Sequence, residues 1–83
     1  MEYKILIKLY VPEIEEEYEI YIPINKSIGE VSILLCKAVN DISKAYPAKR
    51  NARLCDRASG TIYNQDEIIR DTNIRNGTQL VIF

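Results

Sequence analysis

A single capped amphipathic helix is the feature that most constrains how this chain can fold. Ser27-Ile28-Gly29-Glu30 has the form of a capping box, in which the Ser27 hydroxyl accepts from the Glu30 backbone N–H and the Glu30 carboxylate accepts from the Ser27 N–H. Pro47 is expected to end the helix. Apolar residues recur at helical spacing and form one stripe: Ile28, Val31, Leu35, Val39 and Ile42. Such a stripe needs a second layer to cover it.

The residues before the helix alternate in the period of a strand that buries one face. After Pro12 and the acidic residues 13–17, Tyr18, Ile20 and Ile22 repeat the alternation. The two strands are therefore predicted to form a hairpin with a charged connection. Within residues 3–11 the side chains predicted to face the core are Ile5, Ile7, Leu9 and Val11.

Shorter elements follow the helix. Strands are predicted at residues 52–56, 61–63 and 79–83. Turns are predicted at Ala58-Ser59-Gly60, at Asp71-Thr72-Asn73 and at Asn76-Gly77, where both residues tolerate positive φ. The expected architecture is a single α+β domain over residues 1–83, in the order ββαβββ, with one helix packed across a mixed sheet of four to five strands.

Composition and charge narrow the functional classes. The chain is 47% apolar and 28% charged, which is typical of a folded protein and not of a disordered one. Its 11 basic and 12 acidic residues give a net charge of -1, so no strong attraction to nucleic acid or to an anionic membrane is expected. Lys4 and Lys8 interrupt the one candidate signal or membrane segment, which predicts a cytoplasmic protein without membrane insertion.

The charges are unevenly distributed. Acids crowd Glu13, Glu15, Glu16, Glu17 and Glu19, which predicts a solvated loop, with an acidic docking site as the alternative. Bases crowd Lys49, Arg50, Arg53 and Arg57. That cluster lacks interleaved aromatic residues and is interpreted as a solvated face, with binding of acidic proteins as the alternative.

The sequence contains none of the residue patterns expected of a catalytic or metal-binding site. The chain has no histidine, and Cys36 and Cys55 form no CxxC pair and have no recognisable base nearby in sequence. Both thiols are expected to be reduced and to pack as small hydrophobic groups. Asp66-Glu67 and Asp71 lack the spacing and central glycine of a calcium loop, so they are interpreted as caps. We therefore expect no enzymatic activity, metal or cofactor.

The closing residues 69–83 read IRDTNIRNGTQLVIF. This stretch is similar to the closing Leu-x-Asp-x-x-Ile of the ubiquitin superfamily and its Leu-containing last strand, and the chain resembles that superfamily over nearly its whole length. The resemblance continues from Ile20 through Ser27-Ile28 to Val31, and Arg53-Leu54 falls where the family opens its third strand. It implies a ubiquitin-like β-grasp fold.

Within the superfamily the chain is similar to the small YukD-like proteins that accompany bacterial type VII (WXG100) secretion systems. The similarity rests on Asn76-Gly77 before the last strand, on the hairpin around residues 57–60 and on the stop at Phe83. It implies a cytoplasmic accessory or regulator of secretion. Ubiquitin and the sulfur carriers end in a flexible Gly-Gly tail instead, so conjugation and sulfur transfer are not expected.

The sheet face turned away from the helix is the predicted binding surface. Exposed apolar patches commonly mark protein interfaces, although single apolar side chains also occur on any surface. The partner is expected to be a protein, with a secretion-system component or a second copy as candidates. Two alternatives remain: a modifier or sulfur carrier whose tail is missing, and a β-grasp interaction domain unrelated to secretion. The residues that the alternation assigns to this face are Leu6, Tyr10, Tyr21, Cys55, Val81 and Phe83.

Overall fold

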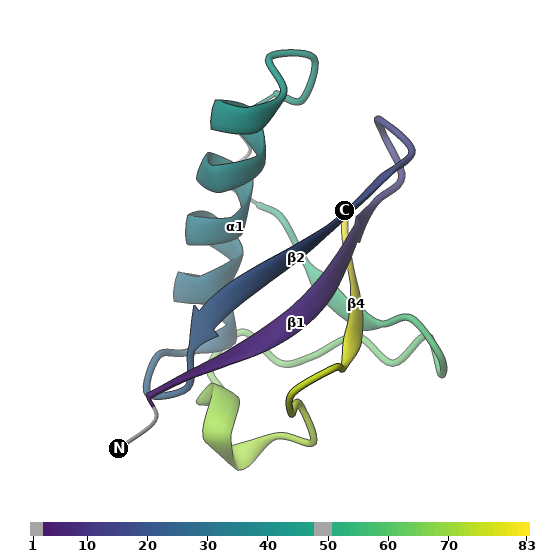
Figure 1. Cartoon of the computed structure of the whole chain (residues 1–83). Coiled ribbons are helices and arrows are strands. Elements are labelled where there is room, and N and C mark those ends of the chain that lie inside the picture. The colour runs from purple at the N-terminus through teal and green to yellow at the C-terminus, as the bar shows by residue number, and fades with distance from the viewer. Residues whose placement is uncertain (1–2, 48–50) are drawn as a thin grey trace.

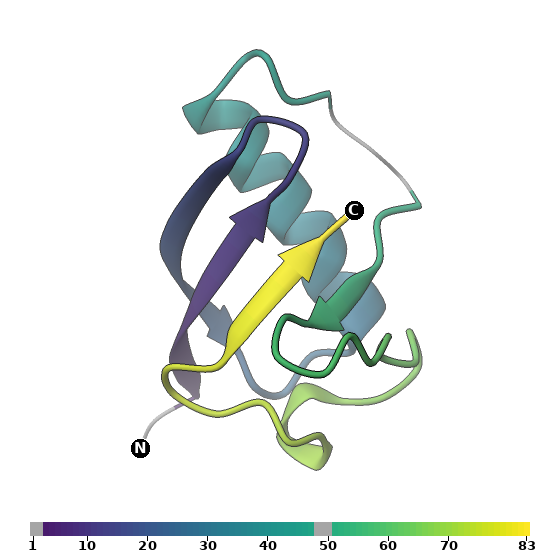
Figure 2. The same ribbon diagram turned by 90° about the vertical axis from the view of Figure 1, so that its right-hand side faces the viewer.

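One helix crosses one face of a four-stranded mixed sheet in the computed structural model, which describes residues 3–47 and 51–83 (Figures 1 and 2). The strands lie in the order β2-β1-β4-β3. Strand β1 pairs antiparallel with β2 and parallel with β4, and β3 pairs antiparallel with β4. The elements are β1 (Lys4–Val11), β2 (Glu16–Pro23), α1 (Ile28–Ile42), β3 (Leu54–Asp56), the 3-10 helix η1 (Ile69–Asp71) and β4 (Gln79–Ile82).

The capping box at the start of α1 is confirmed. The Glu30 backbone N–H donates to Ser27 Oγ at 3.1 Å, and the Ser27 N–H donates to Glu30 Oε1 at 3.1 Å. These hydrogen bonds, first of all the one from the Ser27 backbone, lower the pKa of the Glu30 carboxyl because they stabilise its charged form. The cap therefore sets the first turn of the helix, as the motif predicts.

Removing this cap should weaken the fold by a modest and measurable amount. We expect Ser27→Ala to lower the free energy of unfolding by about 1 kcal/mol, because a helix N-cap contributes about that much. Ser27→Asn keeps a side-chain acceptor at the same position and serves as the control. Urea denaturation followed by circular dichroism measures both, and equal midpoints for the two variants would contradict a capping role.

The core lies between α1 and the inner face of the sheet. The predicted alternation is confirmed in β1, where Ile7, Leu9 and Val11 are fully buried and Ile5 is half-buried. Burial of each such side chain stabilises a fold by about 1.5–3 kcal/mol. The other large, fully buried residues come from every element, including η1 and the segments beside it: Ile22, Ile28, Leu35, Tyr46, Leu54, Ile69, Ile74, Leu80 and Ile82.

A glycine turn joins η1 to β4 and aligns β4 with β1. Gly77 has a φ of 86°, a left-handed conformation that favours glycine. Its N–H donates to the carbonyl oxygen of Leu6 at 2.8 Å, and the side chain of Asn76 accepts from the Leu6 N–H at 2.8 Å. The predicted Asn-Gly turn is thus confirmed, and it extends the β1–β4 pairing beyond the strand itself.

The expected strand at residues 61–63 does not form. The described residues show a single isolated bridge there, between Cys55 and Ile62, so the sheet has four strands and the order is ββαββ. The pairing stops after Tyr63, whose N–H donates to the carbonyl oxygen of Leu54 at 3.0 Å, because Asn64 begins a turn in which its side chain accepts from the Asp66 N–H. The strand expected at 52–56 is likewise shorter, since β3 begins at Leu54.

The end of the helix also differs from the prediction. Helix α1 ends at Ile42 and is capped by Ser43, five residues before the expected stop at Pro47. Ile42, which the helical spacing predicts to lie in the core stripe, is 61% exposed. Helical periodicity assigns a face but does not say how far along the helix the neighbouring sheet extends, and Ile42 lies in the last turn.

Tyr46 is a core residue that the helical pattern does not indicate. The chain turns back after Ser43 and buries Tyr46 completely against α1. Its hydroxyl lies 3.6 Å from the sulfur of Cys36, and its carbonyl oxygen accepts from the Asn40 side chain at 2.7 Å. The residues after the helix are therefore part of the core.

Candidate protein-interaction surface

The outer face of the sheet carries one continuous row of apolar side chains that are half-buried or exposed. Tyr10 of β1 is paired with Val81 of β4, and Val81 is paired with Cys55 of β3. The isolated bridge adds Ile62, which is 58% exposed, at the far end of the row. Because partners in register lie side by side, we name these four residues the outer row.

Phe83 extends the outer row along β4. It stands two residues beyond Val81 and so on the same face. Its backbone exchanges two hydrogen bonds with Arg53, at 2.8 and 3.0 Å, and its side chain is 43% exposed. The β4–β3 ladder therefore continues past the assigned strand end and holds the aromatic ring beside the outer row.

Leu6 and Tyr21 form a second, separate pair. They lie directly opposite each other on β1 and β2. Between this pair and the outer row lies Lys8, whose register partners are Glu19 and Gln79. The six residues predicted from sequence thus fall into two apolar groups divided by a polar line.

An arginine covers one end of the outer row. The Arg57 guanidinium lies 4.6 Å from the centre of the Tyr10 ring, and its Nη1 is 2.6 Å from Glu17 Oε2. Both charged side chains are partly exposed, 40% for Arg57 and 47% for Glu17. The ion pair therefore contributes about 0–1 kcal/mol to the stability of the fold. A cation over an exposed aromatic ring adds a similar amount, about 0.5–1 kcal/mol. Tyr10 is consequently shielded, and Val81, Ile62 and Phe83 remain the accessible apolar contacts.

The two charge clusters predicted from sequence are partly joined by this contact. Glu17 comes from the acidic segment and Arg57 from the basic one. Arg53 is exposed beside Phe83 at the end of the sheet. Lys49 and Arg50 lie outside the described residues. The structure therefore places Arg57 across the sheet, bonded to an acid, and does not leave it on an isolated basic face.

The two cysteines are free thiols packed among other side chains. Cys36 is buried against Tyr46, and Cys55 is half-buried in the outer row. Burial, and next the charge of Asp56, raise the pKa of the Cys55 thiol, which reduces its thiolate fraction at neutral pH. In the described part of the chain no three or more Cys, Asp or Glu side chains are grouped so that they could hold a metal ion.

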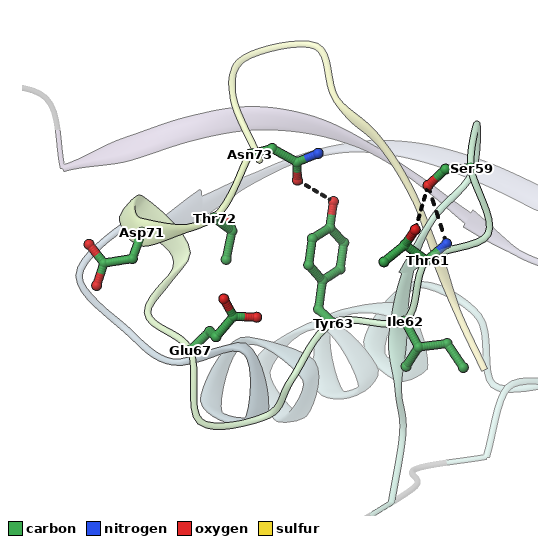
Figure 3. Close-up of a pocket in the computed structure, with 8 residues that line it drawn as sticks. All are labelled: Ser59, Thr61, Ile62, Tyr63, Glu67, Asp71, Thr72 and Asn73. Carbon is green, nitrogen blue, oxygen red and sulfur yellow. Dashed lines mark hydrogen bonds between the residues drawn. The ribbon is translucent and has the colours of Figure 1, made fainter.

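A polar pocket lies beside the outer row and has a volume of about 340 Å³. Figure 3 shows the Tyr63 hydroxyl pointing to Asn73, to which it donates at 2.7 Å, while Ser59 and Thr61 bond to each other. The Asp71 carboxylate points away from Tyr63 (Figure 3). Burial, followed by nearby negative charges, raises the pKa of Tyr63. Tyr63 and Asn73 bond to each other, as do Ser59 and Thr61, and we assign no chemistry to this pocket.

Two contributors to the surface were missed in the sequence. The sequence predicts Ile62 in a strand, and its alternation with Tyr63 directs it outward, but its place at the end of the outer row depends on the bridge to Cys55. The shielding of Tyr10 by Arg57 had no sequence signal, because Glu17 and Arg57 are 40 residues apart.

The element order, the mixed sheet and the crossing helix together define the ubiquitin-like β-grasp fold. No family model matches the chain, and no match is found among the curated proteins. The ubiquitin-like domain of EccD5 from Mycobacterium xenopi is similar in structure, with a TM-score of 0.79, 13% identity, and coverage of 96% of this chain and 92% of that one. The ubiquitin of Caldiarchaeum subterraneum gives a TM-score of 0.65 at 18% identity, covering 95% of this chain and 90% of that one.

A third similar structure is a larger protein. A chain of the MycP5-free ESX-5 inner membrane complex matches with a TM-score of 0.81 and 13% identity over 99% of this chain. The match covers 21% of that chain, so this protein spans about a fifth of its length. At such identities the similarity shows the fold, and the predicted resemblance to ubiquitin-like proteins is confirmed at that level. Among the described residues, no helix is both long and apolar enough to span a bilayer.

Proposed function

We propose that this chain is a non-conjugated, non-enzymatic ubiquitin-like module that binds another protein through the outer row and Phe83. The observation that carries the proposal is the continuity of Tyr10, Val81, Cys55 and Ile62 across the sheet, extended by Phe83. Apolar surface of this kind is depleted in charge at its centre and bordered by Arg57 and Arg53, which is the composition of a protein interface.

The setting that we propose is the cytoplasmic side of a bacterial type VII (WXG100) secretion system. Two observations support it: the YukD-like features of the sequence and the structural similarity to the EccD5 domain and to a chain of the ESX-5 complex. A β-grasp fold serves many functions, so this part of the proposal rests on similarity and not on a contact in the site. In this role the chain is an accessory or regulatory component.

Replacing Phe83 with aspartate should strongly weaken partner capture and leave the fold intact. Phe83 is 43% exposed, so the charge is tolerated in the free protein but is desolvated in a complex. We expect the tagged variant to lose at least about tenfold in capture of its partner, which corresponds to about 1.4 kcal/mol. The measurement is quantitative co-purification from cells that express the tagged protein at equal levels, with circular dichroism to verify folding.

Ile33→Asp is the matched control, because Ile33 is a large exposed apolar residue on the helix and not on the sheet. It should leave capture unchanged. If Phe83→Asp captures the partner as well as the natural protein, the outer row is not the interface. A ladder of heavier, covalently linked bands would instead identify a modifier. A captured partner unrelated to secretion would support the binding role and contradict the proposed place in a secretion system.

A further inference from the structure

A second surface lies away from the outer row, at the end of the molecule where β1 begins. An apolar pocket of about 240 Å³ is lined by Ile5, Ile24 and Ile74, together with Arg70 and Arg75. It brings together the start of β1, the residue after β2, and η1 with the segment that follows it. In Figure 1 the start of β1 and η1 lie at the same end of the molecule.

Backbone hydrogen bonds hold these segments in place. The Ile24 N–H donates to the carbonyl oxygen of Tyr3 at 2.8 Å, and the Arg70 N–H donates to that of Ile24 at 3.0 Å. The Ile69 N–H donates to the carbonyl oxygen of Lys26 at 2.9 Å. The pocket is therefore built on paired backbone and exists before any ligand arrives, which lowers the entropic cost of binding.

The floor of the pocket suits an aliphatic side chain. Ile74 is fully buried, and Ile5 and Ile24 are half-buried and packed against the core. A dry cavity of about 150 Å³ with a similar lining is large enough for benzene. The pocket volume of about 240 Å³ therefore accommodates one leucine, isoleucine or phenylalanine side chain.

The two arginines add positive charge to the apolar lining. Arg75 is oriented by its own Nη1, which donates to the carbonyl oxygens of Thr72 and Ile74, both at 2.7 Å. A guanidinium has five N–H donors, so the Nε and Nη2 donors of Arg75 remain for a ligand. Arg70 is exposed, and its side chain makes no hydrogen bond or ion pair with the described residues.

The surrounding charge has the same sign. Residues 3–5, 24–26 and 70–75, which include the pocket lining, carry Lys4, Lys26, Arg70 and Arg75, and their one acid is Asp71. Asp71 lines the polar pocket described above. Lys26 also acts on Glu30, whose pKa it helps to lower, so the positive charge at the pocket comes mainly from the two arginines. An apolar floor between guanidinium groups is complementary to an aliphatic residue flanked by carboxylates.

We propose that this pocket binds an acidic segment of another protein and takes up one aliphatic or aromatic side chain of that segment. The chain itself contains a segment of this composition, the isoleucine Ile14 among the glutamates of residues 13–17. Ile14, however, is packed against its own core. A second copy would have to release it first, so the occupant is a different protein.

Selection from a library of random twelve-residue peptides tests this proposal on the full chain. We expect the enriched peptides to share an aliphatic or aromatic residue next to Asp or Glu. A synthetic peptide of the enriched sequence should shift the methyl NMR signals of Ile5, Ile24 and Ile74. Arg70→Glu should weaken its binding at least tenfold, measured by fluorescence anisotropy.

Arg53→Glu is the matched control, since it makes the same charge change at an exposed arginine next to Phe83. The proposal is overturned if no acidic peptide family is enriched, if the two charge reversals weaken binding equally, or if the shifts map to other residues. Concentration-dependent shifts of the same methyls in the protein alone would identify a second copy as the occupant and overturn it as well. Phe83→Asp should leave peptide binding unchanged, so failure here is distinguishable from failure of the proposed outer-row interface.

Discussion

Tyr46→Ala is expected to lower the free energy of unfolding by about 3–5 kcal/mol, as the loss of a fully buried aromatic ring does in other cores. Tyr46 is 0% exposed and closes the core after α1. A domain of 83 residues has a total stability of about 4–12 kcal/mol. The variant should therefore lose a large part of its stability, and a substantial fraction of it should unfold below physiological temperature.

Tyr3→Ala provides the matched control, because Tyr3 is 55% exposed and the same atoms are removed. Urea denaturation followed by circular dichroism should show a clearly lower midpoint for Tyr46→Ala and almost no change for Tyr3→Ala. Equal midpoints would mean that residues 43–46 do not contribute to the core as the structure shows.

The second large effect is expected at alkaline pH, where ionisation of Tyr46 should lower the free energy of unfolding. Burial, and next the contact with Cys36, raise the pKa of Tyr46 above its ordinary value of 10.0. A tyrosine is neutral when protonated, so the folded state holds this proton more tightly than the unfolded chain does. Its contribution to stability is fully present below pH 10 and is lost as the pH rises from 10 toward the higher pKa of the folded state.

We expect the free energy of unfolding to fall progressively above pH 10, with absorbance at 295 nm showing that Tyr46 ionises only as the protein unfolds. Tyr63 contributes in the same direction, since burial raises its pKa too. Tyr46→Phe keeps the ring and removes the ionisable group, so its stability should depend less on pH over this range. A variant as sensitive to alkali as the natural protein would show that another group governs the transition.

The two binding surfaces differ in the chemistry that they offer. The outer row presents apolar side chains at the centre of a sheet, and the pocket beside Ile5 offers one apolar site with arginine donors. They lie on separate parts of the fold, so one module has the means to contact two partner segments together. Comparing the partners retained by Phe83→Asp with those retained by Arg70→Glu would separate the two surfaces.

Local patterns were sufficient for much of the fold because they describe interactions between residues close in sequence. The Ser27–Glu30 capping box spans four residues, and the alternation of Ile7, Leu9 and Val11 follows from strand geometry alone. Sequence patterns gave wrong predictions where the extent of a strand or the burial of a side chain depended on residues far away in the sequence. Residues 61–63 make one isolated bridge to β3 and no strand, and Ile42 is exposed although the helical stripe predicts its burial, since both outcomes depend on neighbours outside the segment.

The candidate surface likewise has features that the sequence pattern predicts and features that depend on residues distant in sequence. Alternation correctly placed Tyr10, Val81 and Phe83 on the outer side of the sheet, since side-chain direction in a strand has a period of two. Their role as a binding site stays a prediction. The pocket between Arg70 and Arg75 was not found, because its lining comes from residues 5, 24 and 70–75, and no local pattern relates those positions.

By itself, the sequence determined a capped helix, a hairpin before it, an Asn-Gly turn and a closing apolar strand, which together predict one helix packed across a mixed sheet. Each of these depends on backbone geometry and on contacts within a few residues. Only the tertiary structure decided that Lys8 divides Leu6 from the outer row, that Arg57 reaches Glu17 over Tyr10, and that Tyr46 completes the core. These outcomes depend on strand register and on loop paths, which are set by packing between residues that the sequence keeps far apart.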